Sequence, residues 1–236
     1  MTEHLSPLDN PVWTSLNGPH AHLAEKHGRA LRYPVDVAPF LAVPDRLDEA
    51  VWRDAAELAG AGEELTLTGP HTLPPDSWQV ADVIPGVQLV DDGIDARPDR
   101  EAVRLGRADV PEMIDLVRRT RPGPFLPRTI ELGTYLGIRR DGKLVAMAGE
   151  RLRPPGWTEI SAVCTDPAFR GNGLATRLVL AVAAGIADRG EIPFLHTGAA
   201  NTGAIRLYES LGFRLRHRPD FVVARVPSAA EQRRVG

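Results

Sequence analysis

The stretch VCTDPAFRGNGLATRLVLAVAAG, residues 163–185, decides the fold. A run of β-forming residues stops at Asp166-Pro167, glycines follow at 171 and 173, and a long apolar run begins at once. This order predicts a strand, a tight turn and a helix. Backbone amides at the start of a helix lack partners within it, so a turn without side chains there suits an anion such as a phosphate. A plain strand-to-helix connection also explains the turn when it is taken alone.

The chain on either side of this stretch alternates strand and helix patterns. The expected strands are residues 101–105, 134–140, 143–152, 157–165, 192–198, 213–217 and 221–226, and the expected helices are 108–119, 173–189 and 201–211. Asp141-Gly142 is a strong hairpin-turn signal, and Gly212 is placed to end the last helix. The order predicts an α/β (α+β) fold with a mixed, mostly antiparallel sheet flanked by helices. The helix over 173–189 is apolar nearly all round, which predicts a cover on both sides, with the first part of the chain as the expected cover.

A polar, proline-bearing stretch over residues 91–101 divides the chain into a first half, residues 1–95, and a second half, residues 101–228. In the first half we expect helix-like segments over 20–27 and 48–60, with extended runs between and after them. Each half shows a helix followed by a strand ending in Thr-Gly, so a tandem pseudo-repeat is one interpretation. The first half lacks the Arg-Gly-x-Gly turn, which leaves that interpretation open.

Composition narrows the class of protein. The chain has 236 residues, is 43% hydrophobic and 25% charged, and has a net charge of −3, which argues against general nucleic-acid binding. Cys164 is the single cysteine, so no intrachain disulfide can form and a reduced cytoplasm is the expected location. The N-terminus has no signal-peptide pattern, and the longest apolar run is about half of a membrane span. His20, His22 and His27 do not match a metal-ligand spacing, so we expect no metal.

A second motif lies downstream, in NTGAIRLYESLGF, residues 201–213. Together the two motifs resemble the signatures of the GNAT superfamily of acyl-CoA-dependent N-acyltransferases. The matching residues are Val163, Pro167, Arg170, Gly171, Gly173 and Ala175 in the first motif and Asn201, Ala204, Tyr208, Gly212 and Phe213 in the second. The resemblance covers about residues 101–226, and it extends to the GNAT subgroup in which a degenerate N-terminal half precedes the catalytic half.

The resemblance implies a site for acetyl-CoA as co-substrate. Backbone amides of the turn would hold the pyrophosphate, and the edge of the preceding strand would pair with the pantetheine arm. The residues implied in cofactor binding are Val163, Cys164, Thr165, Arg170, Gly171, Asn172, Gly173, Leu174, Ala175, Asn201 and Ala204. Each also has an ordinary structural explanation: Asn201 is an apt helix N-cap, and Val163 and Ala204 suit a core.

Tyr208 follows Ala204 by four residues and shares its helix face, and the resemblance implies that its hydroxyl protonates the departing thiolate. A core tyrosine is the alternative. Glu159 is the first candidate for a general base and Glu150 the second. Strand alternation places Glu159, Ser161, Val163 and Thr165 on one face, with Ile160, Ala162 and Cys164 on the other.

Several alternatives for the site stay open. If residues 154–156 turn the chain, Arg151 faces Glu159, and an ion pair there would make the carboxylate a poorer base. Catalysis without a dedicated base is a further alternative. Cys164 is expected in the core, and His196 is expected to be structural.

The sequence therefore predicts an N-acetyltransferase that moves an acetyl group from acetyl-CoA to a primary amine by direct transfer. The acceptor is a small amine or a peptide; no nucleic acid or membrane partner is expected, and a homodimer is a possible assembly. A non-catalytic acyl-CoA-binding or regulatory module is the alternative, because the assignment of a base is weak. The proline-rich loop over residues 121–128 either walls the acceptor site or is a plain connection.

Overall fold

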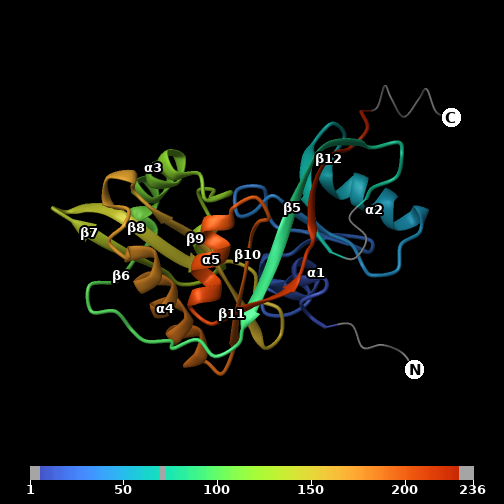
Figure 1. Ribbon diagram of the computed structural model, residues 1–236. Helices are drawn as coiled ribbons and strands as arrows, with labels where there is room; N and C mark the ends of the chain where they lie inside the picture. The colour runs from blue at the N-terminus through green and yellow to red at the C-terminus, as the bar shows by residue number, and fades with distance from the viewer. Residues whose placement is uncertain (1–5, 70–72, 229–236) are drawn as a thin grey trace.

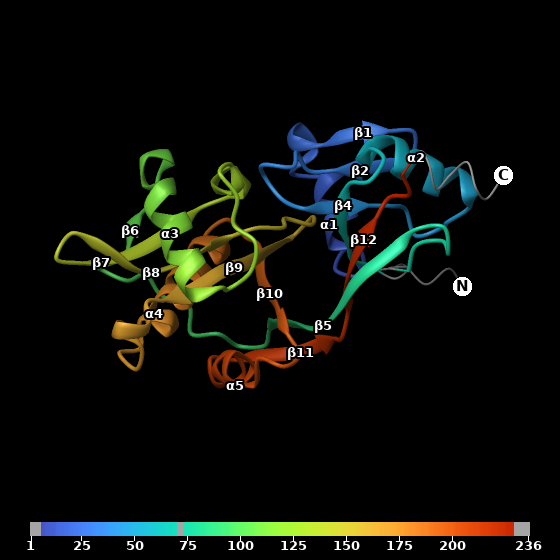
Figure 2. The ribbon, with the colours of Figure 1, turned by 90° about the horizontal axis from the view of Figure 1, so that it is seen from above.

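The computed structural model describes residues 6–69 and 73–228, and these residues form one 12-stranded sheet with helices on its faces (Figures 1 and 2). The strands are β1 (Glu25–His27), β2 (Ala30–Arg32), β3 (Phe40–Ala42), β4 (Glu64–Leu67), β5 (Gln79–Asp91), β6 (Val103–Arg104), β7 (Tyr135–Arg140), β8 (Lys143–Glu150), β9 (Trp157–Thr165), β10 (Ile192–Gly198), β11 (Phe213–His217) and β12 (Asp220–Arg225). The α-helices are α1 (Pro11–Leu16), α2 (Glu49–Ala59), α3 (Val110–Thr120), α4 (Leu174–Ala187) and α5 (Thr202–Ser210), and the 3₁₀ turns are η1 (Ala21–Leu23), η2 (Arg107–Asp109), η3 (Thr129–Leu132) and η4 (Pro167–Phe169).

The sheet runs in the order β1-β2-β3-β4-β12-β5-β10-β9-β8-β7-β6, and β11 pairs with β5 beside this path. Among the described strands only β3 with β4 and β9 with β10 pair in parallel; the other pairs are antiparallel. The predicted mixed, mostly antiparallel sheet is therefore confirmed. A helix joins the two strands of each parallel pair, α2 in one case and α4 in the other. This shared unit supports a pseudo-repeat, which stays a prediction.

Helices α3 and α4 cover opposite faces of the sheet. Met147 of β8 packs in one core with Met113 and Leu116 of α3, whereas Ala146 and Ala148 pack in another with residues of α4. Successive side chains of a strand point to opposite faces, so the two cores lie on either side of β8.

The apolar helix α4 is buried on its outer side as well. The cover is the connection between the halves: the amide of Arg97 donates to the Leu180 carbonyl at 3.2 Å, and Ile94 and Ala96 pack on the same core. Arg177 of α4 also forms an ion pair with Asp99 at 2.7 Å. Ile94 belongs to the first half, so the first half supplies part of the expected cover, and the segment that follows it supplies the rest.

The two halves exchange strands, as Figures 1 and 2 show. The end of β5, from the first half, lies between β10 and β11 of the second half. Strand β12, from the second half, pairs with β4 and with the start of β5. Each half thus completes the sheet of the other. The predicted division at residues 95–101 stays a prediction, and the hydrogen-bonded sheet runs across it.

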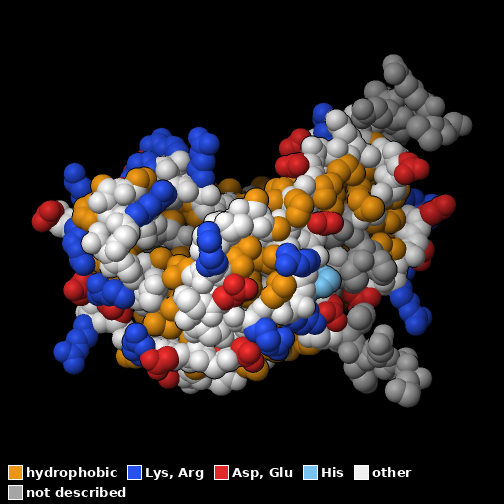
Figure 3. Space-filling model, in the orientation of Figure 1, with side chains coloured by type: hydrophobic (Ala, Val, Ile, Leu, Met, Phe, Trp, Pro, Cys, Tyr) orange, Lys and Arg blue, Asp and Glu red, His pale blue; other side chains and the backbone are white. Residues whose placement is uncertain are grey.

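The start of β5 leaves an exposed edge. Val80, Val83 and Ile84 are each more than two-fifths exposed, and hydrophobic side chains gather over β5 and β12 in Figure 3. Two features reduce the donors available to a further strand. Pro85 has no N–H, and the amide of Val83 donates to the Asp82 carboxylate at 2.8 Å. Such devices oppose pairing with another chain at an edge strand.

The first half was predicted less well than the second. The helix expected over residues 20–27 is wrong: η1 covers only part of it, and β1 follows at Glu25. His20, at the start of this segment, is 3% exposed. Helix α1 was not foreseen, because it is short and begins at a proline. Among the described residues, no helix is long and apolar enough to cross a membrane.

Candidate active site

Strands β9 and β10 run side by side and then separate. Their parallel pairing ends at Ile160 opposite Leu195, although β9 continues to Thr165 and β10 to Gly198. Past Ile160, the edge of β9 that faced β10 has no strand beside it among the described residues. A gap in a sheet with free backbone groups on one side can take an extended ligand arm.

A β-bulge bends β9 at the start of this gap. Met147 of β8 is opposite Cys164 and Gly149 is opposite Ser161, so β9 has one extra residue between them, and Ala162 adopts φ +53°. The extra residue reverses the alternation: Ile160 and Val163 pack on the α4 side. The prediction that Glu159 and Val163 share a face was therefore wrong, because a bulge turns the following side chains to the opposite face.

The glycine turn, residues 170–173, lies between the end of β9 and the start of α4, and it lines the same cleft as the free edge of β9. Gly171 and Gly173 have φ of +80° and +69°, a backbone region that favours glycine. A Cβ on either glycine would meet no protein atom within 4 Å, so the space beside them is open. The amides of Gly171, Asn172 and Gly173 have no hydrogen-bond partner among the described residues. With the first turn of α4 behind them, these donors can hold an anion.

A cleft of about 560 Å³ joins the turn, the free edge of β9 and the first two turns of α5. The predicted cofactor residues that line it are Val163, Cys164, Thr165, Arg170, Gly171, Gly173, Leu174, Ala175, Asn201 and Ala204. Asn172 is not part of the lining, since its side-chain amide donates to the carbonyl of Phe169 at 3.0 Å. Tyr208 lines the cleft, whereas Glu159 and Glu150 do not.

Helix α5 presents Tyr208 to the cleft. Asn201 caps the helix as expected, its side chain accepting from the amide of Ala204 at 3.2 Å. Tyr208 is 7% exposed, and its hydroxyl makes no hydrogen bond with the described residues. Burial, with a smaller effect of Cys164, raises the pKa of Tyr208 to about 12. The phenol therefore remains protonated at neutral pH and can donate its proton.

Two β9 side chains show how the edge of the cleft is built. The Thr165 hydroxyl oxygen is buried and has no hydrogen-bond partner among the described residues, an arrangement that a bound polar ligand would relieve. Cys164 is 6% exposed and packs with residues of the α3 core, as predicted. Burial raises the pKa of the Cys164 thiol to about 11, so it stays protonated and is a poor nucleophile.

Glu159 lies in a closed polar cluster. It is 0% exposed; Arg151 donates to both its oxygens, at 2.8 and 2.6 Å, and His196 Nδ1 lies 2.7 Å from Oε1. Burial alone would raise the pKa of Glu159, but the charge and hydrogen bonds of Arg151 and the contact with His196 hold it well below its ordinary value. An ionised, fully paired carboxylate is a weak proton acceptor.

The cluster continues into the first half. Gln88 of β5 donates to the Leu8 carbonyl at 2.9 Å, lies 3.0 Å from His196 Nε2 and accepts from Arg216 at 2.8 Å. The ionised Glu159 can only accept a hydrogen bond, so the proton of His196 is on Nδ1, which donates to Glu159. The other ring nitrogen, Nε2, then accepts from the side-chain amide of Gln88. Every polar group of His196 is thus engaged, in agreement with the structural role expected for it.

Glu150, at the end of β8, makes hydrogen bonds on the face of the sheet that α4 covers. It accepts from Arg189 at 2.9 Å and from the amide of Thr134 at 3.1 Å. These bonds tie β8 to the end of α4, away from the cleft. Among the described residues, no group of three or more His, Cys, Asp or Glu side chains could hold a metal ion.

Sequence reasoning missed part of the cleft. Thr120 and Phe169 line it, and so do Gly203 and Leu207 of α5. The last two could have been found, because they follow each other by four residues, one position before Ala204 and Tyr208 on the helix. Thr120 had no such signal, because α3 reaches the cleft only through the tertiary fold. Arg121 and Pro122, from the loop singled out as a wall, also line the cleft.

The chain is similar in sequence and in structure to known proteins. The family model described as FR47-like protein matches residues 135–222. A crystal structure of an acetyltransferase described as GNAT-family, from Novosphingobium aromaticivorans, is 43% identical, with a TM-score of 0.85, over 93% of this chain and 98% of that chain. This likeness covers residues of both halves.

Two relatives carry names that state an activity. The N-alpha-acetyltransferase RimI of Mycobacterium tuberculosis is 34% identical over 49% of this chain and 80% of its own length. The mycothiol acetyltransferase of Thermobispora bispora is 40% identical over 45% of this chain. The match spans only 38% of the length of that mycothiol acetyltransferase, so most of the relative lies outside the match.

Proposed function

Because the chain belongs to the GNAT family of acetyltransferases, we propose that it transfers an acetyl group from acetyl-CoA to a primary amine by direct attack on the thioester. The observation that carries the proposal is the cleft. A helix start suited to an anion, a free strand edge and the protonated Tyr208 line it together, which suits the pyrophosphate, the arm and the thioester of an acyl-CoA.

The residues fit acetyl-CoA at three places. Gly171 and Gly173 leave open space beside free backbone amides, which suits the pyrophosphate. From Val163 to Thr165, the edge of β9 that faced β10 has no strand beside it among the described residues, which suits the amides of the arm. The Thr165 hydroxyl, which has no partner within the described part of the chain, offers a further hydrogen bond there. Acetyl-CoA bound in this way would supply the activated acetyl group.

Two proton movements accompany the transfer. The amine attacks the carbonyl carbon of the thioester, the carbon–sulfur bond breaks, and Tyr208 donates its proton to the departing thiolate. The attacking amine must lose a proton. Glu159 is poorly suited to accept it, because its oxygens are engaged by Arg151 and His196. We propose that water carries this proton or that an amine of low pKa reacts without a dedicated base.

The acceptor is proposed only as a class. RimI is named for transfer to α-amino groups, and the other relative is named for mycothiol. Both names state acetyl transfer, and the match to RimI spans 80% of the length of RimI. We propose a small amine or a peptide as acceptor, with a reduced cytoplasm as location, which the single, buried Cys164 supports.

The test is binding followed by turnover. Calorimetry should detect acetyl-CoA binding with one site per chain, and absence of binding at millimolar concentration would refute the proposal. A panel of primary amines, small and peptidyl, is then incubated with acetyl-CoA while free thiol is followed. Thiol release above the rate without amine supports an acetyltransferase. Binding with no release for any amine would favour the alternative, a non-catalytic acyl-CoA-binding module.

A further inference from the structure

The loop over residues 121–128 reaches the cleft with its first two residues. Arg121 follows the last residue of α3 with φ +52° and, with Pro122, lines the cleft. The loop then crosses toward the first half and enters η3. Figure 3 shows Lys and Arg side chains gathered over the nearby α3, whose last turn carries Arg118 and Arg119. An amine that approaches the thioester from this side must pass the loop.

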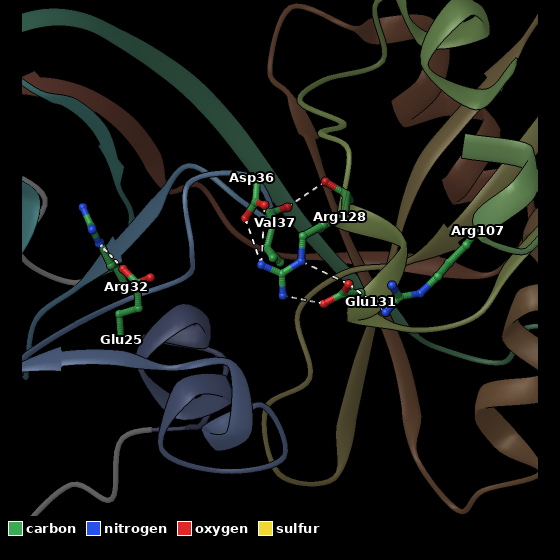
Figure 4. Close-up of polar contacts among 8 residues, drawn as sticks. Glu25, Arg32, Asp36, Val37, Arg107, Arg128 and Glu131 are labelled. Carbon is green, nitrogen blue, oxygen red and sulfur yellow. Dashed lines mark hydrogen bonds and ion pairs between the residues drawn. The ribbon is translucent and has the colours of Figure 1, made fainter. Parts of the chain in front are cut away.

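The far end of the loop is tied to the first half, as Figure 4 shows. The amide of Arg128 donates to the Asp36 carbonyl at 2.9 Å, and its guanidinium donates to the Asp36 carboxylate at 3.2 Å. The same guanidinium donates to Glu131, at 3.1 and 2.8 Å, which fixes its direction within the second half. Arg128 is thus held between two carboxylates, one from each half.

Thr129 makes the closest link. Its side chain is buried, and its hydroxyl donates to the Val37 carbonyl at 2.7 Å while accepting from the Leu126 amide at 2.8 Å. One hydroxyl therefore joins the loop to the first half. Figure 4 shows Val37 and Asp36 side by side on the segment that receives these bonds.

Between its two ends the loop has a third support. Phe125 is 7% exposed and meets the ring of Tyr135 edge-on, with ring centroids 5.4 Å apart. Prolines at 122, 124 and 127 restrict the backbone between these supports. Gly123, at φ +138° with nothing within 4 Å of a Cβ, is the free position. The prolines on both sides of Gly123 limit its freedom, so we expect a displacement at Thr129 to reach Pro122.

We propose that the first half of the chain positions the acceptor-side wall of the cleft, with Thr129 and Arg128 as positioning residues that act through residues 121–127. Ordering a loop costs conformational entropy, and the bonds to Asp36 and Val37 offset that cost. The effect on acceptor binding rests on the proposed function. The effect of these bonds on the order of the loop is independent of that function.

Thr129→Val is the main variant, because it keeps the shape of the side chain and removes both bonds. A matched control is Ser15→Ala. The Ser15 hydroxyl is also buried and also joins the halves, accepting from the Arg153 amide at 2.9 Å, but it does not touch the loop. Asp36→Ala is the second variant, in case Thr129→Val does not fold. Its control is Glu25→Ala, which removes the ion pair with Arg32 that lies within the first half.

Two measurements are made on the full chain. Hydrogen exchange of the amides of Phe125, Leu126 and Arg128 should be about ten-fold faster in Thr129→Val and less affected in Asp36→Ala, with no change in the controls. In the amine assay, KM for the best amine of the panel should rise about five-fold or more in Thr129→Val. The kcat and the affinity for acetyl-CoA should stay within about two-fold.

Unchanged exchange in both variants would overturn the proposal. Faster exchange with an unchanged KM would overturn the link to the acceptor, and so would an equal rise in KM for Ser15→Ala. If the unaltered protein acetylates no amine, the proposed function fails, and the exchange experiment still decides whether the first half holds the loop.

Discussion

Among single residues, Tyr208 is the one on which the proposed chemistry most depends. Tyr208→Phe removes the proton donor and leaves the ring, so we expect kcat to fall about ten-fold or more, equal to about 1.4 kcal/mol of barrier. Acetyl-CoA affinity, measured by calorimetry, should stay within about two-fold.

The control for this variant is Tyr135→Phe. The Tyr135 hydroxyl is buried and has no hydrogen-bond partner among the described residues, so its loss should leave kcat and stability nearly unchanged. If Tyr208→Phe retains full kcat, Tyr208 has no part in the proton transfer.

Glu159 is expected to stabilise the fold rather than to take part in the reaction. Glu159→Gln leaves Arg151 buried without a counter-charge, which should cost about 3–5 kcal/mol and lower the thermal midpoint markedly. The double variant Arg151→Met/Glu159→Leu should recover part of this loss, because no buried charge is then left alone.

The low pKa of Glu159 also sets a direction with pH. Its contribution to stability is present above its ordinary pKa of 4.5 and is lost as the pH falls below that value. The stability of Glu159→Gln should therefore depend less on acid than that of the unaltered chain. A stable Glu159→Gln variant with a shifted pH profile of kcat would restore the carboxylate to the role of base.

The sequence could predict which residues lie together at the site where those residues belong to one helix. Ala204 and Tyr208 share a face of α5 because they are four residues apart, and the structure places both in the cleft. The face of Val163 was predicted wrongly, because the bulge at Ala162 depends on how β8 pairs with β9. The ion pair of Arg151 with Glu159 followed from the position of the turn between their strands.

At the scale of elements, the turn before α4 combines two demands. Gly171→Ala and Gly173→Ala should each cost about 1 kcal/mol of stability, because alanine is strained at positive φ. Each should also raise the Kd for acetyl-CoA about ten-fold or more, because the new methyl group enters the space proposed for the pyrophosphate.

Gly142→Ala separates these two effects. Gly142 also has positive φ, +79°, and open space around it, but it lies in the hairpin turn between β7 and β8 and does not line the cleft. It should lose similar stability with no change in acetyl-CoA affinity. Equal affinity in all three variants would argue against the turn as the anion site.

At the scale of the whole molecule, the exchange of strands makes the halves dependent on each other. Residues 101–236 alone lack the strand that lies between β10 and β11, so we expect them not to fold cooperatively. Residues 1–95 alone lack β12. Co-expression of the two pieces should restore a folded complex, because each supplies the strand that the other needs.

Thermal unfolding and amide spectra of the separate and combined pieces check this expectation. A cooperative transition for residues 101–236 alone would show that β5 is dispensable. Co-purification of the two pieces with acetyl-CoA binding would show that the covalent connection is not needed. That connection also covers α4, so its loss should lower the thermal midpoint even in the complex.

The sequence by itself determined the local features of this protein. Helix periodicity, turn residues and the two motifs predicted the elements of the second half, the mixed sheet and the family, because each depends on residues close together in the chain. Only the tertiary structure decided which edge of β9 is free, which face Val163 takes, what covers α4 and where β5 and β12 pair. Those outcomes depend on contacts between distant segments, whose competing pairings have no signature in a local pattern.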